Sequence, residues 1–302
     1  METLIGHTKH LNYFQKLADA GTLHHAYALL GPDHIGKKTL AEHIIASLLH
    51  TSIHKLPIHP DFLHIDRMDE EGKLKRDITV EHIESVTSKA SRSPIAGPYN
   101  VVLIEDADKM NPYAGNSLLK TLEEPATPTF FFLLASSEEK LLPTIQSRVH
   151  TISLSRIPID QLQSELQAHF PKEKNLEEIV RISGGLPGLV VDWIQNPESF
   201  EAYKLEVNRF FSLFHKPFFE KLAIVEPLFG DKKAHIEGRQ ELTEILHIWV
   251  NCIHLGVKEN TFPQIPSGAV VPMYDIIMET IAGLGQNVHP RLSIENLLLI
   301  LP

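Results

Sequence analysis

A glycine- and lysine-rich segment near the N-terminus has the spacing of a phosphate-binding loop. Its sequence is Gly31-Pro32-Asp33-His34-Ile35-Gly36-Lys37-Lys38-Thr39, which fits the pattern G-x-x-x-x-G-K as far as Lys37. In that pattern the glycines let backbone N–H groups surround phosphates, the lysine reaches the β- and γ-phosphates, and a following Ser or Thr hydroxyl binds Mg²⁺. Lys38 stands in the position of the hydroxyl, and an ammonium repels a cation. The segment therefore predicts phosphate binding with poor retention of Mg²⁺.

Two acids and a serine follow apolar runs further along the chain and could complete this site. Glu105 and Asp106 come directly after the run at 101–104, and Ser136 follows the run at 130–135. In P-loop ATPases, acids at such strand ends hold Mg²⁺ and orient the attacking water. Their usual order is Asp then Glu, so each carboxylate here is displaced by about one C–C bond, which matters for rate. A solvated acidic turn and an ordinary serine turn remain the alternatives.

The candidate residues fall into one degenerate nucleotide site and one separate arginine. The nucleotide site would comprise Gly31, Gly36, Lys37, Lys38, Thr39, Glu105, Asp106 and Ser136. Arg148 follows Ser147 just before a strand predicted at 151–154, and a plain surface arginine is its alternative. His50 and His54 have helical spacing, but no nearby acid or cysteine completes a tetrahedral set, so no metal site is predicted.

The first half of the chain alternates strand-like and helical patterns. Short apolar runs at 26–30, 62–65, 101–104 and 130–134 predict buried strands. Amphipathic spacing predicts helices after the loop and at 79–90, and Asn111-Pro112 has the residues of a helix start, with Asn as the cap. This alternation predicts an α/β core with a parallel sheet and flanking helices over residues 1–155.

Beyond residue 156 only helical patterns continue. Residues 158–198 predict two or three short helices broken by Gly184-Gly185-Leu186-Pro187-Gly188, and 242–253 has one apolar helix face. The proline-containing stretch 260–272 predicts a loop between helices. We therefore expect a small helical lid at 156–204 and an all-α domain at 205–302. The phenylalanine-rich 210–219 segment favours helical core or a helix–helix interface over a ligand pocket.

Composition excludes several classes of protein. The 302 residues have a net charge of −10, which opposes free-standing binding to a nucleic-acid backbone. Cys252 is the only cysteine, so an internal disulfide and a cysteine zinc site are impossible. We find neither a secretory leader nor an apolar run near the ~20 residues that span a bilayer. These features predict a soluble, cytoplasmic protein.

Several longer stretches resemble the clamp-loader subunits of bacterial DNA polymerase III, which belong to the AAA+ class. The block from Asn116 to Pro125, N-S-L-L-K-T-L-E-E-P, is highly specific for clamp-loader ATPases. The resemblance is strong over about 1–155, fair over 180–195, and returns at 290–298 with a segment like the last collar helix. Further matching stretches are His24-His25-Ala26-Tyr27, His59-Pro60-Asp61-Phe62, Ile104-Glu105-Asp106-Ala107-Asp108-Lys109-Met110 and Ser147-Arg148-Val149.

Departures from the family pattern matter for function. Many relatives carry a four-cysteine zinc module where this chain has only 49–58, so we expect no zinc. The lid arginine of active family ATPases falls at Pro187, and Val149 replaces a usual cysteine. Lys38, the Glu-Asp order and Pro187 would each impair hydrolysis. Losses of even tenfold each, about 1.4 kcal/mol apiece, would compound to an almost inert ATPase.

The resemblance thus implies an AAA+ P-loop core, a lid and a collar that carries oligomerisation, in a non-motor subunit that assists ATP-dependent loading of the sliding clamp onto primed DNA. No cofactor would be required, and ATP or ADP would bind weakly. Implied partners are the gamma/tau and delta subunits, with the clamp and primer-template DNA reached through the assembled complex. Arg148 would act as an arginine finger in trans, on nucleotide held by a neighbouring subunit. The alternatives are an active gamma/tau-like ATPase and an AAA+ regulator unconnected with replication.

Overall fold

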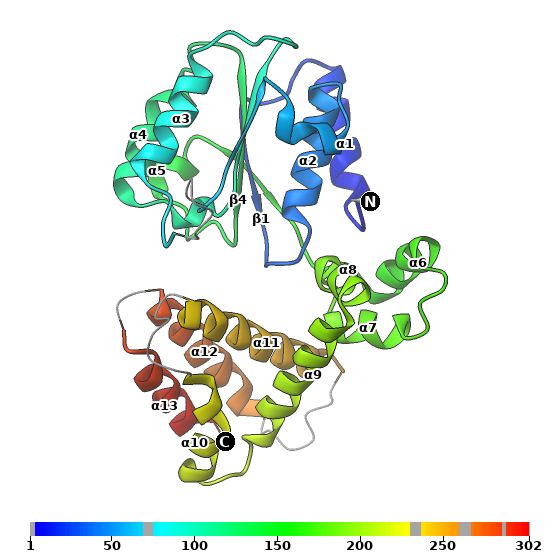
Figure 1. Ribbon diagram of the computed structural model, residues 1–302, viewed down its shortest axis with the longest axis vertical. Coiled ribbons are helices and arrows are strands. Elements are labelled where there is room, and N and C mark those ends of the chain that lie inside the picture. The colour runs from blue at the N-terminus through cyan, green and yellow to red at the C-terminus, as the bar shows by residue number, and fades with distance from the viewer. Residues whose placement is uncertain (1–3, 69–74, 230–236, 260–266, 286–287, 302) are drawn as a thin grey trace. The chain divides into compact units, whose positions relative to one another are not determined.

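The computed structural model describes residues 4–68, 75–229, 237–259, 267–285 and 288–301 (Figure 1). The chain divides into two compact units, Met1–Val190 and Val191–Pro302, and each is described by itself. The expected division into three domains, ending at 155, 204 and 302, stays a prediction. Within the described residues, no helix combines the length and the apolar composition needed to cross a bilayer.

The first unit is built on a five-stranded sheet in which every pairing is parallel. Its strands run in the order β2-β3-β4-β1-β5, so β1 lies between β4 and β5. Strands β1 and β3 are buried along their length and β4 is buried except at Phe130, as continuous apolar runs in a doubly covered parallel sheet should be. The predicted parallel α/β core is confirmed. The strands are β1 (Ala26–Leu30), β2 (Phe62–Ile65), β3 (Asn100–Ile104), β4 (Thr129–Ala135) and β5 (His150–Ser153).

Helices cover both faces of the sheet (Figure 1). On one face lie α1 (Thr8–Asp19) and α2 (Lys37–Leu48), and on the other α3 (Val80–Ala90), α4 (Pro112–Glu123) and α5 (Pro143–Gln146). The start of α4 is as predicted, because Asn111 Oδ1 accepts a hydrogen bond from Ala114 N at 2.8 Å and Pro112 is the first helical residue. Short 3₁₀ turns, η1 (Ile53–Ile58) and η2 (Ala107–Lys109), connect these elements.

Three short helices follow the sheet: α6 (Ile159–His169), α7 (Leu176–Ser183) and α8 (Pro187–Gln195). The last of them runs across the boundary between the two units. The break that the sequence predicted at 184–188 is longer than the one in the structure, which covers only 184–186. Gly184 ends α7 with φ +64°, and Pro187 already begins α8, because the first turn of a helix needs no N–H from proline.

The second unit is helical in its described residues. It contains α9 (Pro197–Ser212), α10 (Phe218–Val225), η3 (Glu226–Phe229), α11 (Glu237–Glu259), η4 (Ser267–Ala269), α12 (Val270–Leu284) and α13 (Pro290–Ile300). The predicted apolar face of α11 is buried around Trp249. The loop predicted at 260–272 is wrong from Val270 onward, because Pro272 lies in the first turn of α12. Residues 260–266 lie outside the described residues.

A buried carboxylate fixes the loop between α3 and β3. Asp61 is fully buried, and its two oxygens accept hydrogen bonds from Ile95 N at 2.6 Å, Ala96 N at 2.7 Å and Gly97 N at 2.8 Å. Burial alone would raise the pKa of Asp61, but these donors and Lys89 outweigh it and hold the pKa below its ordinary value. Asp61 therefore stabilises the folded chain in its ionised form.

We expect Asp61→Asn to lower the free energy of unfolding by about 2–4 kcal/mol, because the amide leaves buried N–H groups unpaired. In a unit of this size that is a fall in melting temperature of roughly 4–16 °C, measured by calorimetry at pH 7. Because the folded pKa is lowered, the stabilisation is present above the ordinary Asp pKa of about 3.9 and is lost as pH falls through the folded value. The difference in melting temperature between variant and wild type should therefore become smaller as the pH falls towards about 3. Exposed Glu84→Gln is the control, and equal melting of both variants would contradict the assignment.

Candidate nucleotide site and the Arg148 pocket

The sheet brings the predicted nucleotide-site residues together at the carboxyl ends of its strands. Gly31 follows β1, Glu105 follows β3 and Ser136 follows β4, and the pairings Leu30–Ala135 and Ile104–Leu133 place these strand ends close together. In open α/β sheets, ligands bind beyond the carboxyl ends of the strands. The sheet thus assembles the set that the sequence predicted, although the residues come from three separate segments.

The loop after β1 needs glycine at both glycine positions of the motif. Gly31 has φ +155° and an added Cβ would lie 2.8 Å from Leu154 O, while Gly36 has φ +97°, a conformation that other residues rarely adopt. The loop then enters α2, whose N-terminus favours anions. His7 Nε2 donates to Ile35 O at 2.7 Å and Gly188 N donates to His34 O at 2.8 Å, so contacts from outside hold the loop in shape.

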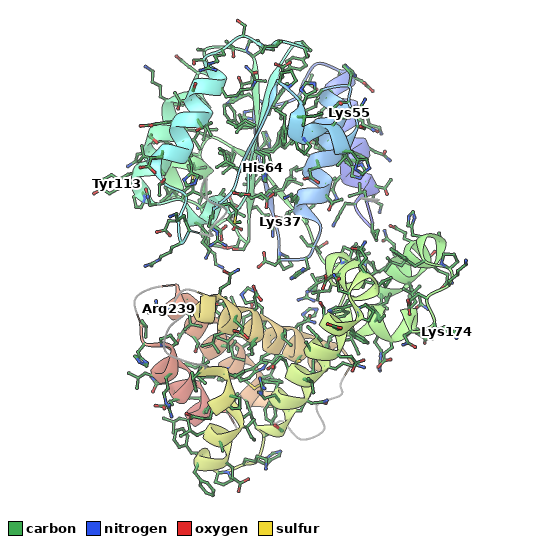
Figure 2. All side chains as sticks on the ribbon, viewed as in Figure 1. Lys37, Lys55, His64, Tyr113, Lys174 and Arg239 are labelled. Carbon is green, nitrogen blue, oxygen red and sulfur yellow. The ribbon has the colours of Figure 1, made fainter. Side chains whose placement is uncertain are left out.

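The two loop lysines have different contacts. Lys37, labelled in Figure 2, donates from Nζ to Gly31 O at 2.6 Å and to Pro32 O at 3.0 Å, so it lies over its own loop. Lys38 instead reaches the end of β3, where its Nζ lies 2.6 Å from Glu105 Oε1. Thr39 is the third residue of α2 and is half-buried. Of the two loop lysines, Lys37 thus remains at the loop and Lys38 is drawn away to the end of β3.

Glu105 is neutralised from two sides. Besides Lys38, His64 of β2 donates from Nε2 to the same oxygen at 2.7 Å. Burial would raise the pKa of Glu105, but the hydrogen bonds from His64 and Lys38 and the charge of Lys38 hold it below its ordinary value. Partial burial would lower the pKa of Lys38, yet Glu105, Glu42 and Asp66 together raise it. Both partners therefore stay charged at neutral pH.

The remaining polar residues are also bound within the chain. Asp106 has φ +49°, and its Oδ2 accepts from Arg67 Nε at 2.7 Å. Ser136 Oγ donates to Asp108 Oδ2 at 2.7 Å. Sequence reasoning missed His64, Arg67 and Asp108. The parallel pairing of β2 with β3 brings His64 and Arg67 here, and no local pattern marks either residue.

Mg²⁺, which P-loop ATPases use, does not fit these residues. The motif would place the ion between a hydroxyl at position 38 and the acid at the end of β3. Here the Lys38 ammonium bridges these two positions and already neutralises Glu105. Elsewhere in the described part of the chain, no group of three or more His, Cys, Asp and Glu side chains could hold a metal ion. The expected absence of zinc stays a prediction.

Arg148 lies between α5 and β5, beside the amino-terminal ends of the strands. The loop lies at their carboxyl-terminal ends. His150 pairs with Tyr27 in β1, so Arg148 is level with the residues that precede β1, whereas Gly31 follows that strand. Six residues of extended chain separate these levels, about 20 Å at roughly 3.3 Å per residue. Arg148 therefore cannot reach nucleotide in the loop of its own chain.

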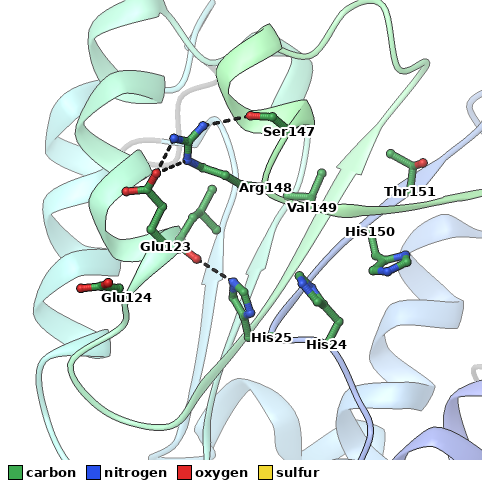
Figure 3. Close-up of a pocket in the computed structure, with 10 residues that line it drawn as sticks. His24, His25, Glu123, Glu124, Ser147, Arg148, Val149, His150 and Thr151 are labelled. Atoms are coloured by element: carbon green, nitrogen blue, oxygen red, sulfur yellow. Dashed lines mark hydrogen bonds and ion pairs between the residues drawn. The ribbon is translucent and has the colours of Figure 1, made fainter.

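Glu123, the last residue of α4, holds the Arg148 guanidinium (Figure 3). Nε of Arg148 donates to Glu123 Oε1 at 2.7 Å, and Nη2 donates to the same oxygen. At the other end, Nη1 donates to Thr144 O at 2.8 Å and to Ser147 Oγ at 2.9 Å. The side chain of Arg148 is 31 % exposed and that of Glu123 is 49 % exposed.

A pocket of about 790 Å³ opens beside this pair. His24, His25 and His150 line it together with Arg148 and Glu123 (Figure 3). His25 Nε2 donates to Leu122 O at 2.7 Å, which fixes the backbone directly before Glu123. The pocket therefore presents a guanidinium and three imidazoles at the surface of the first unit.

Comparison with known families and proteins finds similarity to subunits of DNA polymerase III. A family model described as DNA polymerase III, delta subunit, matches residues 6–158, just over half of the chain. DNA polymerase III subunit delta' of Pseudomonas aeruginosa is 32 % identical over 54 % of this chain and 53 % of its own length. The Escherichia coli protein of the same name is 33 % identical over 45 % of this chain and 40 % of its own length. The matches thus span about half or less of these relatives.

A solved structure shares the fold. The crystal structure of a DNA polymerase III gamma subunit-related protein from Thermotoga maritima superimposes with a TM-score of 0.52 at 18 % identity, over 95 % of this chain and 97 % of that one. The aligned residues include both the α/β unit and the helical unit of this chain. At this identity the likeness concerns the fold.

Proposed function

Because the chain belongs to the family described as DNA polymerase III, delta subunit, we propose that it is a non-motor, delta-prime-type subunit of the clamp loader. It would assist ATP-dependent loading of the sliding clamp onto primed DNA in chromosomal replication, as a component of the DNA polymerase III holoenzyme. Its partners would be gamma/tau and delta subunits, and the clamp and primer-template DNA would be reached through the assembled complex.

The contact between Lys38 and Glu105 carries the non-motor part of this proposal. An ATPase of this class needs a divalent cation between loop and strand end to neutralise charge that develops on the γ-phosphate. The 2.6 Å ion pair takes that position, and Arg67 engages the second acid, Asp106. Lys37 and the loop amides could still hold ATP or ADP weakly, so we propose a degenerate nucleotide site with no required cofactor.

Exposed apolar side chains of the second unit support its role in assembly. Leu292 and Leu299 are seven residues apart on α13, hence on one helix face, and are 57 % and 66 % exposed. Phe219 of α10 is 70 % exposed, whereas Phe210 and Phe214 are buried in the core. Exposed apolar side chains mark protein–protein contacts where they gather on one surface. We propose that this unit packs against sister subunits.

An active gamma/tau-like ATPase is the rival proposal, and turnover distinguishes the two. We expect the purified chain to hydrolyse ATP negligibly, measured as phosphate release with Mg²⁺ present. Lys38→Thr alone should not restore hydrolysis, because Asp106 remains paired with Arg67 and Pro187 replaces the lid arginine. Steady-state turnover of order 1 per second by the isolated wild-type chain would favour the rival.

Co-purification tests the proposed complex. The tagged full-length chain should retain gamma/tau- and delta-type subunits from a lysate of its own source, identified by mass spectrometry. The same tag on an unrelated protein is the control. The proposal would be contradicted if none of these subunits is recovered from the lysate and none binds when the purified proteins are mixed.

A further inference from the structure

The hydrogen bonds of Arg148 divide into a charged set and a neutral set. Nε and Nη2 share Glu123 Oε1, a carboxylate oxygen, whereas Nη1 donates to the backbone oxygen of Thr144 and the hydroxyl of Ser147. Hydrogen bonds to an ionised acceptor are roughly twice as strong as neutral ones. An incoming oxyanion would therefore displace the Nη1 partners more readily than it would displace Glu123.

The position of Glu123 is itself fixed. It ends α4, and the carbonyl of the residue before it accepts a hydrogen bond from His25, which directly precedes β1. Arg148 lies on a short connection between α5 and β5, and its long side chain has many rotamers. The Glu123 carboxylate thus holds the flexible Arg148 guanidinium at the end of α4, and the hydrogen bond from His25 fixes that end beside β1.

We propose that Glu123 is the positioning residue of Arg148. It holds the Nε edge of the guanidinium and keeps the Nη1 end beside Thr144 and Ser147, where that end exchanges its neutral partners for a phosphate oxygen presented by a neighbouring subunit. This inference rests on the proposed clamp-loader function, in which the family resemblance implies that Arg148 acts in trans, and it names the residue that orients Arg148. Because Glu123 is exposed and Arg148 is partly exposed, the pair contributes little to folding stability, so Glu123 can be replaced without unfolding the chain.

The test compares variants of the full chain in the complex reconstituted with its partner subunits, clamp and primed DNA. Glu123→Ala should lower the kcat for ATP hydrolysis roughly fivefold to fiftyfold, the effect of a misplaced catalytic group, with little change in KM. Glu123→Gln keeps an acceptor oxygen at the same length and should retain more activity than Glu123→Ala. The control is Glu124→Gln, because Glu124 lines the same pocket with its carboxylate directed away from Arg148 (Figure 3), and it should stay within about twofold of wild type.

A double-variant cycle separates positioning from a structural role. In the Arg148→Ala background, Glu123→Ala should have no further effect on kcat, and the melting temperature of each variant should stay near that of wild type. If Glu123→Ala matches wild type or raises activity while Arg148→Ala lowers it, the inference is overturned and the trans role stands. A further loss in the double variant would also overturn it. If Arg148→Ala itself has no effect, the trans role fails and the inference fails with it.

Discussion

Replacing Arg148 with alanine should slow ATP hydrolysis at the neighbouring site that it serves by roughly 10³-fold or more, and clamp loading should fall with it. Arginine fingers contribute 10³–10⁵ in rate by neutralising charge in the transition state of phosphoryl transfer. The geometry leaves Arg148 this role only in trans, because Arg148 lies near the amino-terminal ends of the strands and the loop of its own chain lies at their carboxyl-terminal ends. The measurement is ATP turnover and clamp loading by the reconstituted complex with primed DNA.

Two comparisons make this result specific. Arg148→Lys should rescue poorly, because an ammonium lacks the planar fork that binds phosphate in two places. Arg92→Ala removes an exposed arginine elsewhere and should leave both rates unchanged. Arg148→Ala should still fold and enter the complex. If it then matches wild type in both assays, Arg148 is an ordinary surface arginine.

Removing the second unit should abolish assembly, the other large effect that we expect. The cut belongs after Val190, where the units divide, because Trp193 packs on Phe200 and Tyr203 and a chain ending near residue 200 would split this cluster. Without α10 and α13, the chain loses the exposed apolar side chains proposed to bind sister subunits. Affinity for the partner subunits should fall at least roughly 100-fold, as loss of an interface core would require.

Size-exclusion chromatography and circular dichroism together test the shortened chain. We expect a folded α/β spectrum and elution apart from the partner subunits. A full-length chain with Leu292→Asp and Leu299→Asp is a milder variant that keeps the second unit and charges one face of α13. A shortened chain that still binds with undiminished affinity would contradict assembly through this unit.

The sequence was sufficient to predict the parallel sheet because its buried strands depend on local patterns. Apolar runs without alternation are typical of strands buried on both faces, and β1, β3 and β4 are such strands. Gly31 and Gly36 are required by backbone conformations that other residues rarely adopt. Pro272 misled the loop prediction, because proline is tolerated in the first turn of a helix as well as in loops.

The ion pairs of the site could not be predicted in the same way. The sequence indicated that Lys38 opposes Mg²⁺, but its contact with Glu105 depends on how α2 packs beside β3. His64 and Arg67 join the site through the pairing of β2 with β3, a contact between segments far apart in the chain. Likewise, the cis contact of Arg148 with Glu123 requires that α4 end next to the start of β5.

ATP hydrolysis by the reconstituted clamp loader carrying Lys37→Met in this chain tests the central claim most directly. The claim is that this subunit contributes Arg148 to a neighbour while its own nucleotide site performs no catalysis. Lys37→Met removes the loop lysine that we propose to hold phosphate and keeps a side chain of similar length. The account predicts turnover and clamp loading within about twofold of wild type, the margin expected where no transition-state contact is lost. A loss as large as that expected for Arg148→Ala would show that this site is a working ATPase and would contradict the account.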